Sequence, residues 1–331
     1  MEPSQDSAAA KVISLFIYPI KSCRGISVDE APLCSSGLRW DRLWMVVNGR
    51  GRAYTQRVEP KLALVQVEMP MEAFSDVWKP DRSSFLGIRA PGMDVLKIPL
   101  LEPSVVIDGV SVWEWSGSAL DEGNEASEWF SNYLGKRSRL VRFNEAAQTR
   151  PVNAGHVQTY RVKFNDMYPF LLASQGSLNT LNDRLKEPIQ MSRFRPNILV
   201  DGCEPFIEDF WKEIKINSLT FYSGELCYSC KVPTIDQETA IAAAGAEPTE
   251  TLRTFRSDKV LLPKHKHQGR VYFGHTFVCK DSVVTQSKKA NTIKVGDPVY
   301  ALKAVSSYDD VNANSDYTKT LKISSSSFGT T

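Results

Sequence analysis

The sequence has few cysteines, little net charge and no long apolar run, and each shortage excludes a class of protein. Six irregularly spaced cysteines among 331 residues are too few for a disulfide scaffold, so a reducing compartment is expected. Lys plus Arg (40) nearly balances Asp plus Glu (38), and the formal charge of +2 gives no general attraction to nucleic acid. The longest apolar stretches, such as residues 43–47 and 198–200, are too short for a transmembrane segment.

The first residues also lack a targeting pattern. They carry Glu2 and Asp6, and no basic residue precedes Lys11. Secretory signals begin with positive charge, and mitochondrial transit peptides are rich in Arg and poor in acids. The sequence therefore predicts a cytoplasmic protein, with a mitochondrial location as the alternative if a leader preceded this chain.

The composition that remains is that of a globular, strand-rich protein. Hydrophobic residues make up 42% and charged residues 24%, and the length predicts about two domains. The pair Asn48-Gly49 predicts a hairpin that returns along residues 52–56, whereas residues 69–91, rich in Pro, Asp and Ser, indicate a long connection. Runs of β-branched and aromatic residues predict strands at 11–18, 43–47, 62–69, 105–115, 170–173, 197–200, 214–222, 271–279 and 298–302.

Two segments have helical periodicity. Residues 125–134 place apolar side chains on one face and are followed by Gly135, a typical helix stop. Residues 174–185 have three leucines on one face, with Ser174 or Ser177 as the N-cap. Without regular alternation of strands and helices, a doubly wound or (β/α)₈ enzyme is not expected. The prediction is a mainly β (α+β) protein of two packed β-barrel-like domains with a few edge helices.

Changes in composition predict where these domains lie. The polar, unpatterned stretch 144–156 separates a domain over residues 11–143 from a second domain over residues 157–303. Residues 1–10 are expected to be flexible, and residues 304–331, rich in Ser, Asp and Asn, to form a disordered tail.

Cys227 and Cys230 form a Cys-x-x-Cys motif whose chemistry the spacing leaves open. A structural zinc site needs four ligands, and the remaining Cys and His residues are poorly spaced for it: Cys203, Cys279, His265 and His267. A thioredoxin-like pair would open a helix, which the following sequence KVPT breaks. Two small, half-buried cysteines at a strand end are the plain structural interpretation. As thiolates, the same residues would bind a soft metal.

Three other motifs place cations and hydrogen-bonding groups beside predicted strands: RFRPN at 193–197, YPIKS at 18–22 and WDR at 40–42. Each alone could be a solvated surface group or an ordinary Asp–Arg pair. Together they indicate a pocket with three cations, hydroxyls and a thiolate. Because Arg offers a fork that matches phosphate, such a pocket suits an anionic cofactor carrying a soft metal.

These motifs, in this order, resemble the MOSC family: YPIKSCRG at 18–25, DRLWMVVN at 41–48, FRPNILVDG at 194–202, CYSCKVPTID at 227–236 and IKVGDPVY at 293–300. The resemblance covers roughly residues 11–302 and is strongest to the branch with an N-terminal MOSC β-barrel domain, the amidoxime-reducing components. Molybdenum cofactor sulfurases end in the same domain pair. They also carry a large pyridoxal phosphate-dependent domain, for which 331 residues leave no room.

The resemblance implies a molybdenum cofactor, Mo-molybdopterin, whose metal is bound and used in catalysis through Cys230. The family's small hydroxyl residues before Pro-Phe are replaced here by Met167 and Tyr168, so that a contact there would come from backbone or from the Tyr168 hydroxyl. The animal members have Arg directly before the ligand cysteine, whereas this chain has Ser229. The implied cofactor-binding set is Lys21, Ser22, Arg42, Met167, Tyr168, Arg195, Asn197, Tyr228, Ser229 and Cys230.

The activity implied by the resemblance is two-electron reduction of N-hydroxylated compounds: amidoximes, hydroxylamines and N-hydroxylated bases. The sequence has no Gly-rich dinucleotide loop or haem motif, so electrons would come from outside, in this family from cytochrome b5 and its NADH-dependent reductase. Two alternatives stay open. One is a protein that binds and delivers the cofactor or transfers sulfur without reducing anything, and the other is a globular scaffold with an incidental cysteine pair.

Overall fold

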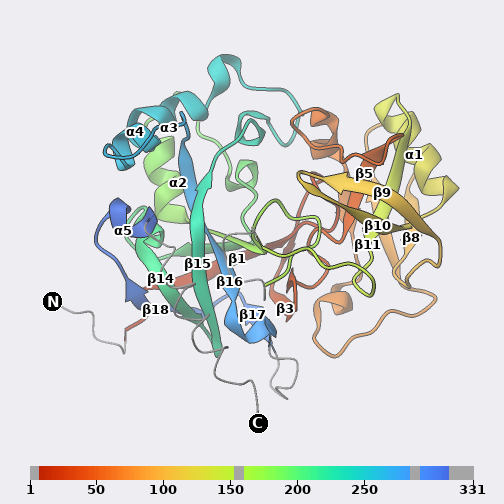
Figure 1. The fold of residues 1–331 in the computed structure, drawn as a ribbon, viewed down its shortest axis with the longest axis horizontal. Coiled ribbons are helices and arrows are strands. Elements are labelled where there is room, and N and C mark those ends of the chain that lie inside the picture. The colour runs from red at the N-terminus through yellow and green to blue at the C-terminus, as the bar shows by residue number, and fades with distance from the viewer. Residues whose placement is uncertain (1–6, 153–159, 284–290, 313–331) are drawn as a thin grey trace, which may run out of the picture.

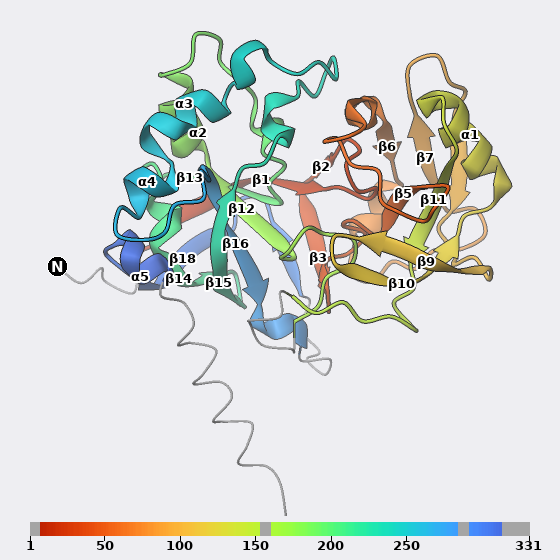
Figure 2. The same ribbon diagram turned by 45° about the horizontal axis from the view of Figure 1, so that its top comes forward.

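The computed structural model describes residues 7–152, 160–283 and 291–312, and it confirms a mainly β fold with a few helices. Two halves lie side by side (Figure 1). The C-terminal half is a barrel, and the N-terminal half is a more open set of small sheets (Figure 2). Among the described helices, none is long and apolar enough to cross a membrane.

The barrel closes through a strand from the other end of the chain. Strand β1 pairs antiparallel with β13, so that Val12 lies opposite Val200 and Leu15 opposite Ile198. Closure removes the unpaired sheet edges that would otherwise invite association. In order around the barrel, its described strands are β13 (Ile198–Asp201), β12 (Phe170–Ser174), β16 (Tyr272–Cys279), β15 (Leu219–Tyr228), β14 (Trp211–Ile216), β18 (Pro298–Ala304) and β1 (Ala10–Ile17), with β2 (Ile26–Val28) beside β1.

The N-terminal half consists of two antiparallel sheets, which form a half-barrel rather than a second closed barrel. The larger has the order β5 (Trp44–Asn48), β11 (Ser138–Phe143), β10 (Trp115–Asp121) and β9 (Val106–Val112). The smaller has the order β6 (Gln66–Glu68), β7 (Phe85–Arg89) and β8 (Leu96–Pro99). A further sheet joins distant parts of the chain, with β17 (Thr292–Lys294), β3 (Glu30–Cys34) and β4 (Gly37–Leu38) in that order.

One apolar core runs through both halves. Trp44 and Phe130 of the N-terminal half belong to the same buried cluster as Leu15, Phe170 and Phe221 of the barrel. Because this core is continuous, residues at the junction have defined positions relative to one another.

Both predicted helices are confirmed. Helix α1 (Asn124–Leu134) buries its apolar face and ends at Gly135, whose φ of 69° is the left-handed conformation that glycine adopts at low cost. Helix α2 (Gln175–Asn182) is capped by Ser174, whose Oγ accepts a 3.1 Å hydrogen bond from the Ser177 N–H. The other described helices are short: α3 (Thr249–Phe255), α4 (Asp258–Leu261), α5 (Tyr308–Asn312), and the 3₁₀ turns η1 (Pro60–Leu64), η2 (Met71–Phe74), η3 (Met191–Arg193), η4 (Ile207–Phe210), η5 (Val232–Thr234), η6 (Ala244–Ala246) and η7 (Lys280–Val283).

Several local predictions are wrong. The single strand expected at 214–222 is a hairpin of β14 and β15, because Asn217 takes a positive φ of 54° and makes a tight turn without Gly or Pro. Residues 52–56 form two isolated bridges, from Ala53 to Val47 and from Arg52 to Ser111, and not a strand. The connection expected over 69–91 contains β7.

The chain end also differs from its prediction. Residues expected in a disordered tail from 304 onward include helix α5, whose Val311 is buried against the barrel. The Lys212 ammonium donates a 2.8 Å hydrogen bond to the carbonyl of Val311 and fixes this helix. Residues 313–331, the larger part of the predicted tail, lie outside the described residues, as do residues 1–6 of the predicted flexible N-terminus.

Candidate functional site

Where β1 leaves the barrel, the ring of Tyr18 lies between two guanidinium groups. The Cζ atoms of Arg42 and Arg195 are each 4.3 Å from the ring centroid. The Tyr18 hydroxyl donates a 3.1 Å hydrogen bond to the carbonyl of Pro196. Burial raises the pKa of Tyr18 to about 12 although both arginines oppose this, so the hydroxyl is neutral at ordinary pH. Two arginines 153 positions apart thus meet on one aromatic ring.

Asp41 orients this arrangement. Both of its carboxylate oxygens lie 2.7 Å from Nη1 of Arg42. The backbone N–H of Tyr18 and the side-chain amide of Asn165 also donate to it, at 2.9 and 3.0 Å. Since Asp41 is only 1% exposed and every contact is with the chain, it serves to hold Arg42 in place.

Lys21 is buried beside this group. Its Nζ donates to the carbonyl of Phe164 at 2.7 Å and to Oδ1 of Asp166 at 2.5 Å. Burial lowers the pKa of Lys21 to about 8, and Asp166 limits the shift. A buried lysine keeps its positive charge near pH 7 only when an anion lies beside it.

Asp166 links the buried lysine to the surface. Its side chain is 56% exposed and lies 3.7 Å from Arg57, and it accepts a 3.2 Å hydrogen bond from the indole of Trp113. Burial opposes ionisation of Asp166, but Lys21 and Arg57 outweigh it and hold the pKa of the carboxyl below its usual range. Arg57 lies 4.4 Å from the Trp113 ring.

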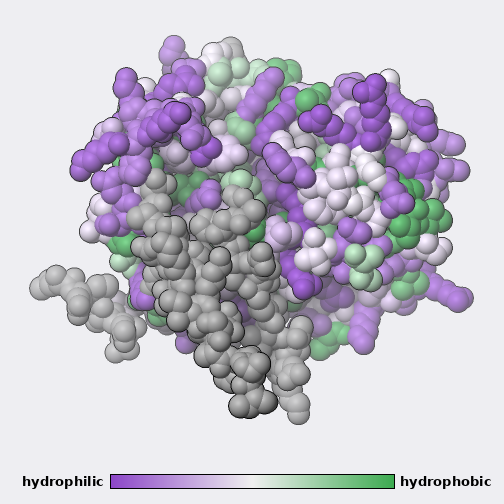
Figure 3. Space-filling view, in the orientation of Figure 1, coloured by the Kyte–Doolittle hydropathy of each residue, from purple (hydrophilic) through white to green (hydrophobic). Residues whose placement is uncertain are grey.

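We call Lys21, Arg42, Arg57 and Arg195, with Asp41 and Asp166, the cation cluster. Four cations against two carboxylates leave a net charge of +2. Within the described residues, Arg195 makes no ion pair; its Nη2 donates 2.7 Å to the carbonyl of Cys23. Hydrophilic side chains predominate where the two halves meet on the face in Figure 3. The positive charge of the cluster exceeds what its own two acids neutralise. The cluster therefore attracts a further anion.

The Cys-x-x-Cys motif begins at the end of β15. The N–H of Ser229 donates a 2.7 Å hydrogen bond to Val271, and turn η5 follows the motif. Burial, and then the neighbouring Cys230 and Asp166, raise the pKa of Cys227 to about 12, so this thiol is neutral and within electrostatic reach of the cation cluster. The Cys230 sulfur accepts a 3.4 Å hydrogen bond from the N–H of Val232.

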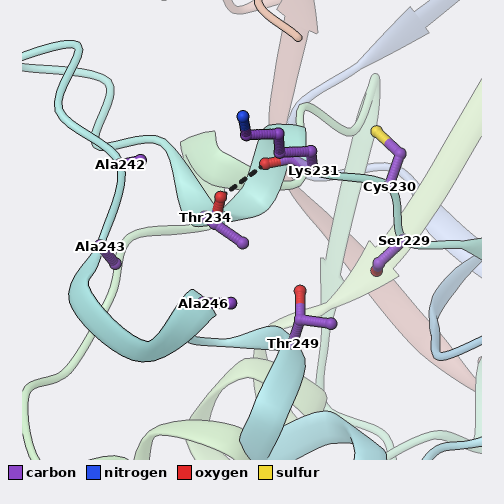
Figure 4. A pocket seen from close by; sticks show the side chains of 8 residues that line it. All are labelled: Ser229, Cys230, Lys231, Thr234, Ala242, Ala243, Ala246 and Thr249. Carbon is purple, nitrogen blue, oxygen red and sulfur yellow. Dashed lines mark hydrogen bonds between the residues drawn. The ribbon is translucent and has the colours of Figure 1, made fainter.

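The two cysteines thus differ in their surroundings. Cys230, but not Cys227, lines a cavity of about 520 Å³ next to the motif (Figure 4). The side chain of Tyr228 is exposed, with the guanidinium of Arg270 4.7 Å from its ring. Among the described residues no cluster of three metal-ligating side chains occurs.

The remaining expected site residues fall into two groups. Ser22, at a positive φ of 69°, lies directly after Lys21, and its carbonyl accepts from Gln56. Asn197 lies beside Arg195, but its amide is engaged with the barrel: Nδ2 donates to Phe16 at 3.2 Å, and Oδ1 accepts from Leu171 at 3.3 Å. Asn197 therefore fixes the strand ends from which Arg195 extends.

The side chains of Met167 and Tyr168 lie elsewhere. They pack in a separate apolar cluster with Val162 and Val278. Tyr168 lies against Gly224 so closely that a Cβ there would come within 2.3 Å of its ring. The structure thus brings Lys21, Arg42 and Arg195 together and leaves these two side chains outside the cation cluster.

Sequence reasoning missed four members of the site: the Tyr18 ring, Arg57, Trp113 and Asp166. Asp166 directly precedes Met167, and Tyr18 belongs to the YPIKS motif, so both stood beside residues already singled out. Trp113 takes a positive φ of 53° in the turn between β9 and β10, where a continuous strand was expected.

Comparison with known proteins identifies the class. Residues 9–137 match the MOSC N-terminal beta barrel domain, and residues 159–300 match the MOSC domain. The chain belongs to the MOSC family, in the branch that combines these two domains.

Within that branch the chain is similar to mitochondrial amidoxime reducing component 2 of Rattus norvegicus, with 34% identity over 88% of this chain and 83% of the relative. The corresponding human protein is 32% identical over the same shares. Mitochondrial amidoxime-reducing component 1 of Mus musculus is 33% identical over 88% and 82%. A solved protein of Bordetella bronchiseptica is 29% identical over 34% of this chain and 84% of its own length, with a TM-score of 0.25.

Proposed function

We propose that this protein is a molybdenum-cofactor-dependent oxidoreductase that reduces N-hydroxylated compounds. The proposal is carried by the cation cluster, with its net charge of +2, together with a Cys230 sulfur that lines a cavity and accepts a backbone hydrogen bond. The names of its relatives, amidoxime-reducing components, support the same reaction.

The residues present fit molybdopterin. Its phosphate is an anion, and the cluster offers Lys21, Arg42 and Arg195 with more positive charge than Asp41 and Asp166 neutralise. Its metal is soft, and Cys230 offers a thiolate. When bound, the group supplies the two-electron redox chemistry by which the hydroxyl oxygen is removed.

The chain's own residues have positioning roles in this proposal. Asp41 holds the Arg42 guanidinium by two 2.7 Å contacts, and Tyr18 stacks between Arg42 and Arg195. The fork of each arginine is thereby oriented before the anion arrives, which lowers the entropy lost on binding. Lys21, whose pKa is about 8, gains charge stabilisation when a second anion approaches.

Electrons would come from cytochrome b5 and its NADH-dependent reductase, the donors that the family resemblance implies. The relatives' names favour a mitochondrial location over the cytoplasmic one for this chain. Because the same residues would bind the cofactor in a carrier, reduction itself is the decisive measurement.

The test compares Cys230→Ser with Cys227→Ser in protein made by a host that synthesises molybdenum cofactor. Replacing a soft sulfur ligand by a hard hydroxyl should abolish benzamidoxime reduction in Cys230→Ser while the fold persists. Cys227→Ser should retain most activity, because Cys227 does not line the cavity and its buried thiol is neutral. Molybdenum and zinc contents and reduction with purified donors are measured on all three proteins.

Each other outcome has a clear meaning. Parallel loss of activity in the two variants, or stoichiometric zinc without molybdenum in the wild type, overturns the proposal. Bound molybdenum without reduction of any N-hydroxylated compound identifies a cofactor carrier instead.

A further inference from the structure

The cavity next to Cys230 is built from three pieces of the MOSC domain. One is the end of the cysteine motif, one is the loop after η5, and one is the first residue of α3 (Figure 4). Its volume is about 520 Å³, within the range of small-molecule sites. The lining residues are Ser229, Cys230, Lys231, Thr234, Ala242, Ala243, Ala246 and Thr249.

This cavity is distinct from the cation cluster. None of the four cations of the cluster lines it, whereas the Cys230 side chain does. An occupant of the cavity would therefore lie beside the proposed metal ligand without taking the place of the cofactor's phosphate. That is the position required of a substrate.

The wall opposite the cysteine is firmly held. The N–H of Ala243 donates a 2.7 Å hydrogen bond to Thr234, and the N–H of Asp236 donates 2.8 Å to Ile241. Ile235 and Ala242 form an antiparallel bridge across the same loop. The cavity is therefore formed before a ligand binds, and its alanine methyl groups limit the occupant's width.

The lining disfavours a cationic occupant. Among the described lining residues there is no carboxylate, and the one charged side chain is Lys231. The nearby Asp236 is turned to other partners: it pairs with Arg193 at 2.9 Å and caps the following turn. A cation that entered would lose hydration without gaining a counter-charge.

Two hydroxyls provide the polar contacts. Figure 4 shows Ser229 and Thr249 near each other, across the space from Ala242 and Ala243. Thr234 is engaged, since its hydroxyl donates 2.8 Å to the carbonyl of Lys231. The Thr249 hydroxyl is buried and has no hydrogen-bond partner within the described part of the chain. A buried hydroxyl without a partner is costly, and a polar ligand group could satisfy it.

We propose that this cavity is the substrate pocket and that its alanine methyls and unpaired hydroxyl select small, flat, uncharged N-hydroxylated compounds over cationic ones. The inference rests on the proposed function for the reaction. The assignment of the pocket has a test of its own.

The first experiment tests occupancy without turnover. Protein with ¹³C-labelled alanine methyl groups is titrated with 4-(hydroxymethyl)benzamidoxime and followed by NMR. The Ala242 and Ala243 methyl signals should shift saturably, while that of the distant Ala9 should not. Unchanged Ala242 and Ala243 signals at saturating ligand overturn the pocket assignment whether or not the protein is a reductase.

The second experiment fills the pocket. Ala243→Leu should lower kcat/KM for 4-(hydroxymethyl)benzamidoxime by about tenfold or more, since added methylenes displace the ligand. Its molybdenum content should equal that of the wild type. Ile241→Ala is the matched control, because Ile241 is an exposed residue of the same loop that does not line the cavity. Equal kcat/KM for Ala243→Leu and the wild type contradicts the proposal.

The third experiment reverses the charge preference. The probes are 4-(hydroxymethyl)benzamidoxime and 4-(aminomethyl)benzamidoxime, similar in size but neutral and cationic at pH 7. The wild type should prefer the neutral probe by about tenfold in kcat/KM. Thr249→Asp should shift the preference toward the cation by about tenfold relative to the neutral Thr249→Asn.

No difference between the Asp and Asn variants overturns the selectivity, even where both variants reduce the neutral probe and the reductase proposal stands. If no variant reduces either probe, the reductase proposal fails and the NMR titration alone decides the pocket.

Discussion

Two of the groups of buried charges in the molecule are built differently. The first is the cation cluster at the junction of the halves. The second, which we call the Arg256 cluster, lies where η4 meets α5 and strand β16 and consists of Glu208, Asp209, Arg256, His275 and Tyr308. There Arg256 donates to Asp209, to the Tyr308 hydroxyl at 2.6 Å and to the carbonyl of Tyr272 at 3.2 Å.

In the Arg256 cluster the charges of Arg256 and Asp209 pair with each other inside the protein. Arg256 is 2% exposed and Asp209 0%, and the Tyr308 hydroxyl donates a further 3.0 Å hydrogen bond to Asp209. In the cation cluster the arginines stack on Tyr18 and the cations outnumber the acids. An ion pair held inside the protein indicates a structural role, and an excess of positive charge at the junction of the halves indicates a place for a ligand.

The substitution expected to have the largest effect on stability is Asp209→Asn in the Arg256 cluster. Removing the carboxylate leaves Arg256 charged and buried without a counter-ion, and we expect a loss of about 3–5 kcal/mol in the free energy of unfolding. Urea unfolding followed by circular dichroism measures it. A loss below about 1 kcal/mol would show that the pair contributes little to stability.

The same cluster predicts a pH dependence through Glu208. Burial and the neighbouring Asp209 raise the pKa of Glu208 from 4.5 to about 7, against the hydrogen bond from Ser177. The folded state thus favours the protonated carboxyl, so the stability it contributes is complete below about pH 4.5 and is lost as the pH rises to about 7. Glu208→Gln removes this loss. Since a tenfold change in a protonation equilibrium corresponds to about 1.4 kcal/mol, the variant should gain roughly 3 kcal/mol relative to the wild type across that window.

Unfolding free energies at pH 4.5, 6 and 8 measure this difference. His275 acts in the opposite sense, because burial lowers its pKa to about 4 and its contribution is lost as the pH falls from 6.5. It is present in both proteins and cancels in the comparison. Glu250→Gln, at an exposed position of α3, is the control and should show no pH-dependent difference. A difference between Glu208→Gln and the wild type that is constant with pH would refute the assignment.

The fold was predictable where the signals were local. The apolar spacing and caps of α1 and α2 involve residues within a few positions of each other, and both helices occur as expected. The turn at Asn217 has no Gly or Pro, and its positive φ is indicated only by the Asn itself, a weaker signal than an Asn-Gly pair. Closure of the barrel pairs β1 with β13 across more than 180 positions. Hydrophobic periodicity is a local signal and does not predict which distant strands pair.

The site was predictable in part. Lys21, Arg42 and Arg195 stood out because charged residues beside strand ends are easily noticed, and they do converge. The contacts that organise them were not predictable, since the stacking on Tyr18 and the pairing of Asp166 with Lys21 depend on three-dimensional packing. The burial of Tyr168 against Gly224 likewise depends on a close approach that no motif encodes.

At the cation cluster, Arg195→Ala should weaken cofactor retention by about 1.5–3 kcal/mol, the worth of one charge-assisted hydrogen bond. Molybdenum and pterin contents after gel filtration measure it. Arg193→Ala is the matched control, because Arg193 pairs with Asp236 and has no contact with the Tyr18 ring. Unfolding free energy should change little in Arg195→Ala, unlike in Asp209→Asn. Equal retention by the two arginine variants would remove Arg195 from the proposed site.

The smallest effects are expected when one tyrosine in each cluster is replaced by phenylalanine. The Tyr308 hydroxyl bonds to two charged groups, so Tyr308→Phe should cost about 1.5–3 kcal/mol of unfolding free energy. The Tyr18 hydroxyl bonds only to the neutral carbonyl of Pro196, so Tyr18→Phe should cost about 0.5–1.5 kcal/mol. Burial raises the pKa of both hydroxyls, so neither ionises between pH 6 and 8 and the comparison holds throughout that range.

Because Tyr18→Phe keeps the ring on which Arg42 and Arg195 stack, cofactor retention should stay at the wild-type level. Loss of the cofactor in Tyr18→Phe would mean that the hydroxyl itself contacts the ligand, and the ring would then not be what prepares the two guanidinium groups for binding.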